Sequence, residues 1–241
     1  PLGRTREVVE ICRQVWRREK LSYRGKHFTL PLDEAHGGTG LGKPLKLINH
    51  PVRDRIPIVL AALGPKNVAL AAEIAEGWEP IFFFPERADE AFGAALADGA
   101  TRRDPALGPL QIVADTSIAI TDDPALEAAA LARVRAQVAL YVGGMGARGK
   151  NFYHDVAVRY GFADAAATVQ DLYLGGRKDE AAAALPEDLV RGISLVGSKA
   201  AVADRVAAFR AAGVTTVNAS PLAPTHEQRV RDIATLKELS A

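Results

Sequence analysis

The chain has 241 residues, of which 48% are hydrophobic and 24% charged, and this length allows one α/β domain with a single continuous core. Its 30 basic and 29 acidic side chains nearly cancel and form no long run of one sign, which argues against binding of nucleic acid or an anionic membrane. The single cysteine, Cys12, excludes an internal disulfide.

Four segments are expected before the first buried strand: a helix over 4–19, a short strand over 21–30, a glycine-rich loop over 33–42, and a strand over 44–49 that would pair with the first one. Residues 56–63 then form an uncharged apolar run that Gly64 and Pro65 close. Such a run is typical of a strand buried on both faces of a parallel sheet.

A strand followed by a helix recurs four times from residue 56 onward. The four units cover 56–75, 78–96, 110–140 and 214–240. This alternation indicates a parallel sheet. Residues 125–191 form a helical stretch far longer than an ordinary crossover connection, and we interpret it as an insertion within a single domain over 1–241.

The helix before the last strand has clear ends. Ser198 is its expected N-cap and Gly213 its C-terminal stop. No stretch of about 18 uncharged apolar residues occurs, so we expect no membrane span. Residues 1–20 carry charges throughout, unlike a signal-peptide core, and we expect a cytoplasmic protein.

Several motifs that carry chemistry are missing or incomplete. The stretches 37–44 and 144–151 nearly match a P-loop, but Pro44 and Asn151 replace the hydroxyl that binds magnesium. No glycine-flanked serine of a hydrolase elbow occurs. The five histidines are not spaced as a metal pair on one helix face, and we expect no metal site.

The junction at Gly64 predicts an anion-binding site. A buried strand runs into Gly64, Pro65 occupies the first helical position, and no side chain blocks the free backbone N–H groups. A phosphate bound there would gain from the helix dipole and these donors, with Lys66 as counter-charge. A glycine–proline pair also occurs as simple punctuation between a strand and a helix, so the residues alone leave both interpretations open.

Several stretches resemble the F420-dependent enzymes of the bacterial luciferase-like family. They are Ala61-Ala62-Leu63-Gly64-Pro65-Lys66-Asn67-Val68-Ala69 and the segments 4–11, 42–47, 75–78, 141–146, 150–153 and 211–215. The resemblance implies an α/β fold, a TIM-like (β/α)8 barrel of the bacterial luciferase type. It also implies that the first four strands are absent from this chain, and that the helical insertion over 125–191 lies between strands 7 and 8.

The resemblance further implies hydride transfer between the deazaflavin coenzyme F420 and an organic substrate. The cofactor-binding residues that it implies, along the ribityl-phosphate tail, are Ala61, Ala62, Leu63, Gly64, Pro65 and Lys66. In relatives the acidic and histidine residues beside the deazaflavin ring belong to the first four strands, so no catalytic residue is assigned. An FMN-dependent luciferase-like monooxygenase and a non-catalytic cofactor-binding homologue remain as alternatives.

Three consecutive phenylalanines fall at the C-terminal end of a barrel strand, where active sites of this fold are built. We expect a substrate pocket lined by Phe82, Phe83, Phe84 and Met145. Relatives that oxidise glucose 6-phosphate carry a lysine near this strand end, but residues 78–86 contain none. We therefore expect a largely apolar carbonyl compound, alcohol or activated alkene as substrate.

Residues 141–153 are expected to form a mobile flap or rim beside the active-site mouth. Four glycines between 143 and 149 make the backbone costly to order, and an ordinary solvent loop is the alternative. Because four strand–helix units are about half of a (β/α)8 barrel, we expect the chain alone to be inactive and its open sheet to aggregate or recruit another copy. The expected partners are a small-molecule substrate and, in a homodimer, a second copy.

Overall fold

A computed structural model describes residues 1–240. The helices are α1 (Leu2–Trp16), α2 (Pro65–Ile74), α3 (Ala94–Ala100), α4 (Pro124–Ala139), α5 (Phe152–Arg159), α6 (Ala163–Leu174), α7 (Lys178–Ala183), α8 (Glu187–Gly192), α9 (Lys199–Ala211) and α10 (His226–Leu239). The strands are β1 (Tyr23–Arg24), β2 (Thr29–Leu30), β3 (Val59–Ala61), β4 (Gly77–Glu79), β5 (Gln111–Ile120), β6 (Leu195–Gly197) and β7 (Thr216–Pro221).

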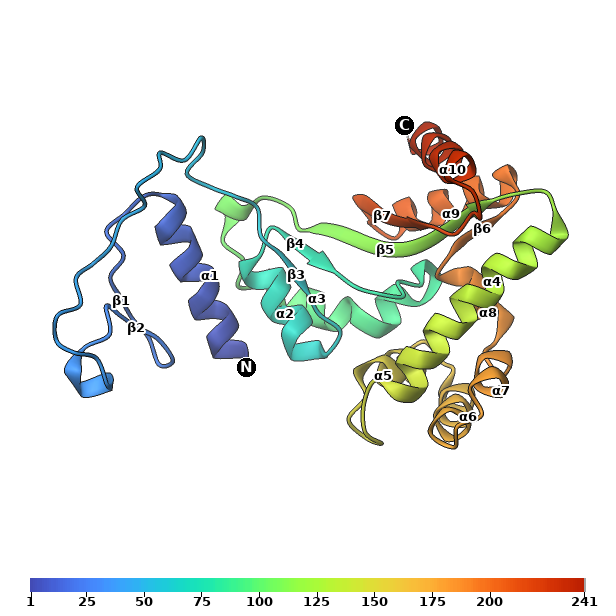
Figure 1. Cartoon of the computed structure of the whole chain (residues 1–241), viewed down its shortest axis with the longest axis horizontal. Helices are drawn as coiled ribbons and strands as arrows, with labels where there is room; N and C mark the ends of the chain where they lie inside the picture. Colours follow the sequence, from blue (N-terminus) through green and yellow to red (C-terminus); the bar gives the residue numbers. More distant parts are fainter. Residues whose placement is uncertain (241) are drawn as a thin grey trace.

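The centre of the fold is a parallel sheet, as the alternation of strands and helices predicts. β3 pairs with β4 and β4 with the start of β5, while β6 and β7 both pair with β5. The ten-residue strand β5 is the longest strand and runs across the middle of the molecule (Figure 1). In the described part of the chain β3 pairs with β4 only, so one edge of β3 has no partner strand there.

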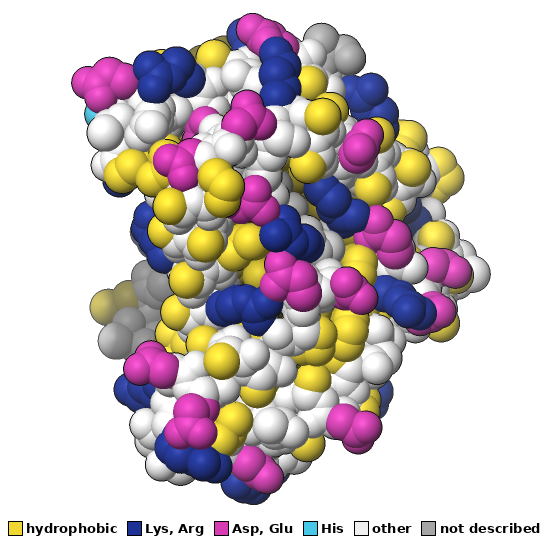
Figure 2. All heavy atoms as spheres, turned by 90° about the vertical axis from the view of Figure 1, so that its right-hand side faces the viewer, with side chains coloured by type: hydrophobic (Ala, Val, Ile, Leu, Met, Phe, Trp, Pro, Cys, Tyr) yellow, Lys and Arg dark blue, Asp and Glu magenta, His cyan; other side chains and the backbone are white. Residues whose placement is uncertain are grey.

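Five consecutive helices, α4 to α8, connect β5 to β6. Of these, α5, α6 and α7 lie at the lower right of the molecule in Figure 1, and α4 packs against β5 and β6. Figure 2 shows the right-hand face of the molecule, where acidic and basic side chains are interspersed among apolar ones. Ion pairs account for part of this mixture, since Arg191 contacts both Glu127 and Glu187.

The N-terminal strands differ from the prediction. Residues 44–49 form no strand, and β1 instead pairs with β2 in a short antiparallel hairpin within residues 21–30. The physical reason is the buried carboxylate of Glu7, which accepts hydrogen bonds from the backbone N–H groups of Lys26, His27 and Phe28 in the turn of this hairpin. The turn is thereby fixed by α1, and a more distant strand is not needed.

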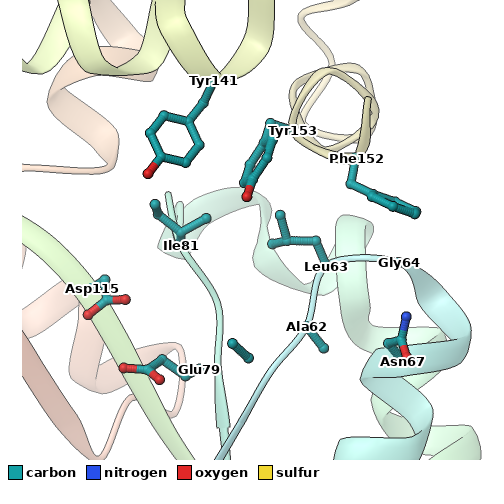
Figure 3. Close-up of a pocket in the computed structure, with 11 residues that line it drawn as sticks. Ala62, Leu63, Gly64, Asn67, Glu79, Ile81, Asp115, Tyr141, Phe152 and Tyr153 are labelled. Carbon is teal, nitrogen blue, oxygen red and sulfur yellow. The ribbon is translucent and has the colours of Figure 1, made fainter. Parts of the chain in front are cut away.

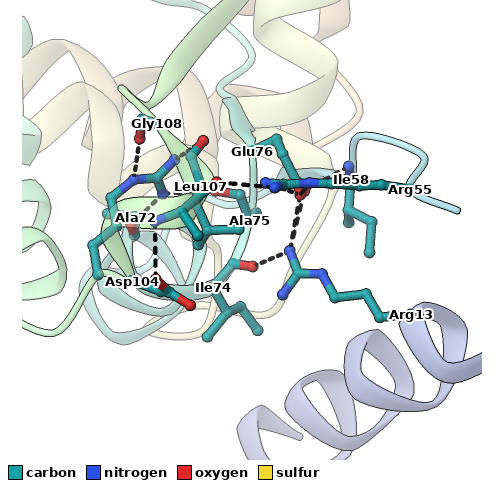
Figure 4. Close-up of polar contacts among 12 residues, drawn as sticks. Arg13, Arg55, Ile58, Ala72, Ile74, Ala75, Glu76, Asp104, Leu107 and Gly108 are labelled. Atoms are coloured by element: carbon teal, nitrogen blue, oxygen red, sulfur yellow. Dashed lines mark hydrogen bonds and ion pairs between the residues drawn. The ribbon is translucent and has the colours of Figure 1, made fainter. Parts of the chain in front are cut away.

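A second buried carboxylate, Glu76, joins α1 to the N-terminal end of the sheet (Figure 4). It accepts hydrogen bonds from the Ile58 backbone N–H at 2.8 Å and from the guanidinium groups of Arg13 and Arg55. Burial opposes ionisation of Glu76, but these donors outweigh it and lower its pKa below the ordinary value. Arg13 also donates to the Ile74 carbonyl, so one arginine links α1 to the end of α2.

The main core lies between the sheet and the helices that follow its strands. Its largest fully buried side chains include Trp78, Phe83, Phe92, Tyr160 and Phe209. Trp78 is at the centre of this core and packs edge-on against both Phe83 and Phe92. Because Trp78 is held in the core, it fixes the position of β4, whose last residue Glu79 lines the site described below.

Candidate functional site

A cavity of about 400 Å³ lies beside the carboxyl ends of β3 and β4 and against β5 (Figure 3). Its lining comes from five separate stretches of the chain: Ala61, Ala62, Leu63, Gly64, Asn67, Glu79, Ile81, Asp115, Tyr141, Phe152 and Tyr153. Ligand sites of parallel α/β folds are built at this end of the strands. The volume is at the lower end of the range for small-molecule sites, so the cavity fits part of a large cofactor.

The start of α2 forms one end of this cavity. Gly64 is its extended N-cap, with φ −71° and ψ 141°, and no side chain caps the helix. Pro65 occupies the first turn, as predicted, and the Gly64 carbonyl accepts the first backbone hydrogen bonds from Asn67 and Val68. An uncapped helix N-terminus facing a cavity attracts an anion through its free N–H groups and the helix dipole.

One buried and one partly buried interaction fix the backbone of this strand–helix junction. The indole Nε1 of Trp78 donates to the Ala62 carbonyl at 2.9 Å. The guanidinium of Arg159 donates to the Leu63 carbonyl at 2.8 Å and lies over the Phe92 ring, 4.9 Å from its centroid. The junction therefore has a set position relative to β4 and α5 before any ligand binds.

An aromatic wall from the segment over 141–153 covers the cavity: Tyr141 and Tyr153 line it, and Phe82 packs behind them. Tyr141 and Tyr153 meet edge-on with ring centroids 4.7 Å apart, and Phe82 packs against both at 5.3 and 6.4 Å. Figure 3 shows the two tyrosine hydroxyl groups pointing into the cavity. Edge-on aromatic contacts of this kind stabilise a rigid apolar wall with polar tips.

Phe82 has a left-handed backbone, with φ +57°, which is rare for a residue with a large side chain. The buried hydroxyl of Tyr160 fixes this conformation, because it donates to the Phe82 carbonyl at 3.0 Å and accepts from the Phe84 N–H at 3.2 Å. Burial raises the pKa of Tyr160, so its hydroxyl stays protonated and able to donate. The strained turn directs Phe82 toward the aromatic wall.

Two carboxylates lie on the strand side of the cavity. Glu79 is the last residue of β4 and Asp115 lies on β5, and both are on the side away from Gly64 in Figure 3. Asp115 accepts a hydrogen bond of 2.6 Å from the side-chain amide of Asn218 on β7. The cavity thus has a helix N-terminus at one end and hydrogen-bond acceptors at the other.

A second cavity of about 300 Å³ adjoins the first and shares Ile81 and Asp115 with it. The rest of its lining is Phe82, Thr116, Ser117, Val134, Gln137, Ile193, Ser220 and Leu222. The lining combines apolar side chains with hydroxyl and amide ones. Phe82 stands between the aromatic wall of the first cavity and the interior of the second.

The residues expected to bind a cofactor lie in different places. Ala61, Ala62, Leu63 and Gly64 line the first cavity, whereas Pro65 and Lys66 do not. The exposed Lys66 side chain lies in a separate surface depression with residues of α1, including Arg6. Lys66 therefore lies outside this cavity, and Gly64 is the residue of the α2 N-terminus that lines it.

The residues expected to line a substrate pocket also lie in different places. Phe82 lines the second cavity, but Phe83 and Phe84 are buried in the core with 1% and 7% of their surface exposed. Met145 is 51% exposed and lies outside both linings. Residues 82–84 lie beyond the end of β4, and with the left-handed turn at Phe82 only this ring of the three lines a cavity.

The glycine-rich segment over 141–153 is attached at both ends. Residues Leu140–Gly144 continue α4 as a π-helix, and the buried side chain of Asn151 donates to the carbonyls of Tyr141 and Val142. The same side chain caps α5 by accepting from the backbone N–H groups of Tyr153 and His154. Only the exposed turn between these ends has the character of a loop.

Several lining residues follow from no motif in the sequence. Glu79 ends β4, Ile81 lies just after it and Asp115 lies on β5, while Asn67 is in the first turn of α2. Their one detectable signal is a charged or polar residue within an otherwise apolar strand, as at Glu79 and Asp115. Among residues 1–240 there is no group of three or more histidine, cysteine, aspartate or glutamate side chains that could hold a metal ion, and no helix long and apolar enough to cross a membrane.

Comparison with known proteins identifies related chains. Residues 1–216 match the family model described as luciferase-like monooxygenase. The chain is 46% identical over 240 residues to Rv3520c of Mycobacterium tuberculosis, a protein named provisionally as a coenzyme F420-dependent oxidoreductase. The matched region covers 98% of this chain and 67% of that protein.

Two solved structures share the fold. One is the coenzyme F420-dependent tetrahydromethanopterin reductase from Methanopyrus kandleri, with a TM-score of 0.71 and 24% identity over 97% of this chain and 61% of that one. The other is an F420-dependent secondary alcohol dehydrogenase in complex with an F420–acetone adduct, with a TM-score of 0.63 and 14% identity over 98% and 60%. The chain therefore spans about three fifths of the length of these solved structures.

Proposed function

Since the chain belongs to the luciferase-like monooxygenase family, we propose that it is part of an oxidoreductase that transfers a hydride between coenzyme F420 and an organic substrate. The observation that carries the proposal is the cavity at the start of α2, with an uncapped helix N-terminus at Gly64 and acceptors at its far end. The names of the 46% identical relative and of the two solved structures support F420 as the cofactor.

The cavity fits the chemistry of such a cofactor. A phosphate beside Gly64 meets backbone N–H groups and no acidic side chain, because Glu79 and Asp115 lie on the opposite side. A hydroxyl-bearing chain that extends from this phosphate has the two carboxylates as hydrogen-bond acceptors. When bound, F420 supplies a ring carbon that accepts or donates a hydride.

The residues of this chain position the cofactor and exclude water. Trp78 and Arg159 hold the backbone of the junction, so Gly64 meets the phosphate without rearrangement. Tyr141 and Tyr153 cover the cavity with their rings and direct their hydroxyl groups inward. A covered, preorganised site favours hydride transfer over loss of the hydride to solvent.

The second cavity is the proposed substrate compartment. It joins the first at Ile81 and Asp115, so a substrate there lies next to the cofactor cavity. Its lining of apolar side chains with interspersed serine, threonine and glutamine fits an organic molecule with an apolar body and at least one hydrogen-bonding group. Phe82 is the proposed substrate-pocket residue, and the buried Phe83 and Phe84 are proposed to support it through the core, whereas the exposed Met145 lies outside both cavities.

We also propose the finer architecture. The helices α4 to α8 are interpreted as an insertion between the seventh and eighth strands of a (β/α)8 barrel, in which further parallel strands pair with the free edges of the sheet. A homodimer in the cytoplasm is the proposed state of the whole protein.

The test is a titration of the full-length protein with F420 and, separately, with FMN, in which binding is measured by the change in cofactor fluorescence. The proposal expects saturable binding of F420 that is at least tenfold tighter than that of FMN. Tight FMN binding without F420 binding would contradict it and favour a flavin-dependent monooxygenase. Binding of F420 without reduction or oxidation of any carbonyl compound or alcohol would favour a non-catalytic homologue.

A further inference from the structure

A third cavity, of about 200 Å³, lies between α4 and α10 at the carboxyl end of β5. Its lining is Ala119, Ile120, Thr121, Leu126, Ala129, Ala130, Arg133, Leu222, Ala223, Pro224, Gln228 and Asp232. Leu222 is the one residue that this lining has in common with the proposed substrate compartment. The third cavity is therefore separate from the proposed cofactor cavity, with which it shares no lining residue.

The wall of this cavity contains a buried carboxyl group with an unused oxygen. Asp232, on α10, has only 5% of its surface exposed. The backbone N–H of Ile120 donates to its carboxylate, but within residues 1–240 the Oδ2 atom has no hydrogen-bond partner. A buried acceptor left unpaired is energetically costly, so a donor that reaches it gains binding free energy.

The rest of the lining restricts what that donor can belong to. Most of the wall is alanine, isoleucine, leucine and proline, which favours an apolar body. The one cationic side chain of the lining, Arg133, donates to the Leu222 carbonyl at 2.9 Å. Burial raises the pKa of Asp232, because the ionised carboxylate is disfavoured away from water.

We propose that this cavity is a second small-molecule site that binds a neutral, hydroxyl-bearing molecule with an apolar body of about six carbons. Its hydroxyl group donates to Oδ2 of Asp232, and its carbon skeleton lies against Ile120, Ala130 and Leu222. An apolar cavity of about 150 Å³ is known to take benzene, so one of 200 Å³ has room for a six-membered ring and a hydroxyl group.

The charges of the lining argue for an alcohol over other donors and acceptors. An ammonium group would share the cavity with the Arg133 guanidinium, and a carboxylate would face Asp232. A hydrocarbon of the same shape would leave Oδ2 unpaired. The proposal rests on this cavity alone and does not depend on the function proposed for the first one.

The test compares two probes of similar shape on the isotopically labelled full-length protein. Cyclohexanol and methylcyclohexane are titrated separately, and binding is followed by amide and methyl resonances of Ile120 and Ala130. We expect cyclohexanol to bind at least tenfold more tightly than methylcyclohexane. The variant Asp232→Leu should lose this preference, whereas Asp179→Leu, an exposed aspartate on α7, should keep it.

A second variant tests the cavity if Asp232→Leu does not fold. Ala130→Leu adds side-chain volume from the α4 wall and should abolish binding of both probes while Asp232 stays in place. The proposal is overturned if the two probes bind equally, if the preference persists in Asp232→Leu, or if cyclohexanol shifts only residues of the second cavity such as Ser117 and Gln137. It is also overturned if a crystal soaked in cyclohexanol holds only an ordered water on Oδ2.

Discussion

The ring of Phe152 lies 3.4 Å from the position that a Cβ atom on Gly64 would occupy. This contact is ordinary in distance, but it means that a larger side chain at Gly64 has to enter the cavity or displace the ring. Gly64 is thus a place where one substitution tests the proposed phosphate position directly, because its φ of −71° is open to any residue.

We predict that Gly64→Glu weakens F420 binding at least tenfold, or about 1.4 kcal/mol, because its carboxylate occupies the place of the phosphate. Gly64→Gln is the matched control, with the same size and no charge, and should weaken binding less. Both are measured by titration of the full-length protein, and circular dichroism checks the fold. Equal affinities for the wild type and a folded Gly64→Glu variant would refute the phosphate position.

The ion cluster at Glu76 gives a prediction about stability and pH. The pKa of Glu76 is lowered in the folded state, so its contribution is fully present above its ordinary pKa of 4.5 and is lost as the pH falls through the folded value. We expect Glu76→Gln to lower the free energy of unfolding at pH 7 by about 2 kcal/mol, since hydrogen bonds to a charged group are lost.

The pH dependence separates the charge from simple packing. The difference in unfolding free energy between the wild type and Glu76→Gln should shrink as the pH falls below 4.5, measured by urea titration at several pH values. Glu90→Gln, in an exposed i,i+3 pair with Arg87, is the control and should change stability little. A difference that stays constant down to pH 3 would show that ionisation of Glu76 contributes nothing.

The hydroxyl of Tyr160 is predicted to hold the strained turn at Phe82. Tyr160→Phe removes the bonds to the Phe82 carbonyl and the Phe84 N–H, and should cost about 2 kcal/mol of stability. It should also weaken binding in the adjoining cavities, because Phe82 is freed to leave the aromatic wall. Tyr173→Phe is a control outside both linings. A substrate KM unchanged in Tyr160→Phe would mean that the turn keeps its conformation without this hydroxyl.

The segment over 141–153 is predicted to become more ordered when the cofactor binds. Amide hydrogen exchange of residues 141–153 in the full-length protein should slow on addition of F420, because Tyr141 and Tyr153 line the cavity. Identical exchange with and without F420 would favour an ordinary solvent loop. Asn151→Asp keeps the helix-capping acceptor but loses the donors to Tyr141 and Val142, so it should speed exchange around 141–146 and leave α5 protected.

Features with a local physical cause could be predicted from the sequence. Gly64 and Pro65 mark the start of α2, Ser198 caps α9 through the Ala201 N–H, and Gly213 ends the following turn with φ +87°. Each of these depends on residues within a few positions of one another. The apolar runs mark the parallel strands, but the expected burial of 56–63 on both faces is wrong: Val59 and Ala61 are exposed, because β3 pairs with β4 only within residues 1–240.

Features that depend on distant contacts could not be predicted. Strand pairing of 44–49 was expected, but the Glu7 carboxylate stabilises a closer hairpin from nineteen or more positions away. The role of Lys66 was inferred from its neighbours in sequence, yet its position on α2 turns it toward α1. The acidic side of the cavity joins Glu79, Asp115 and Asn218, which no local pattern connects.

The pairing of β5 with β7 has a consequence for how the chain folds. Asp115 and Asn218, which bond across these strands, are 103 positions apart, and closing so long a segment carries a large entropy cost before any contact compensates it. The helices α4 to α8 lie within this segment and pack on one another, so their formation brings the two strands closer. We therefore expect β4 to join β5 early in refolding and β7 to join last, which leaves the side of β5 that holds Asp115 exposed to other chains for the longest time.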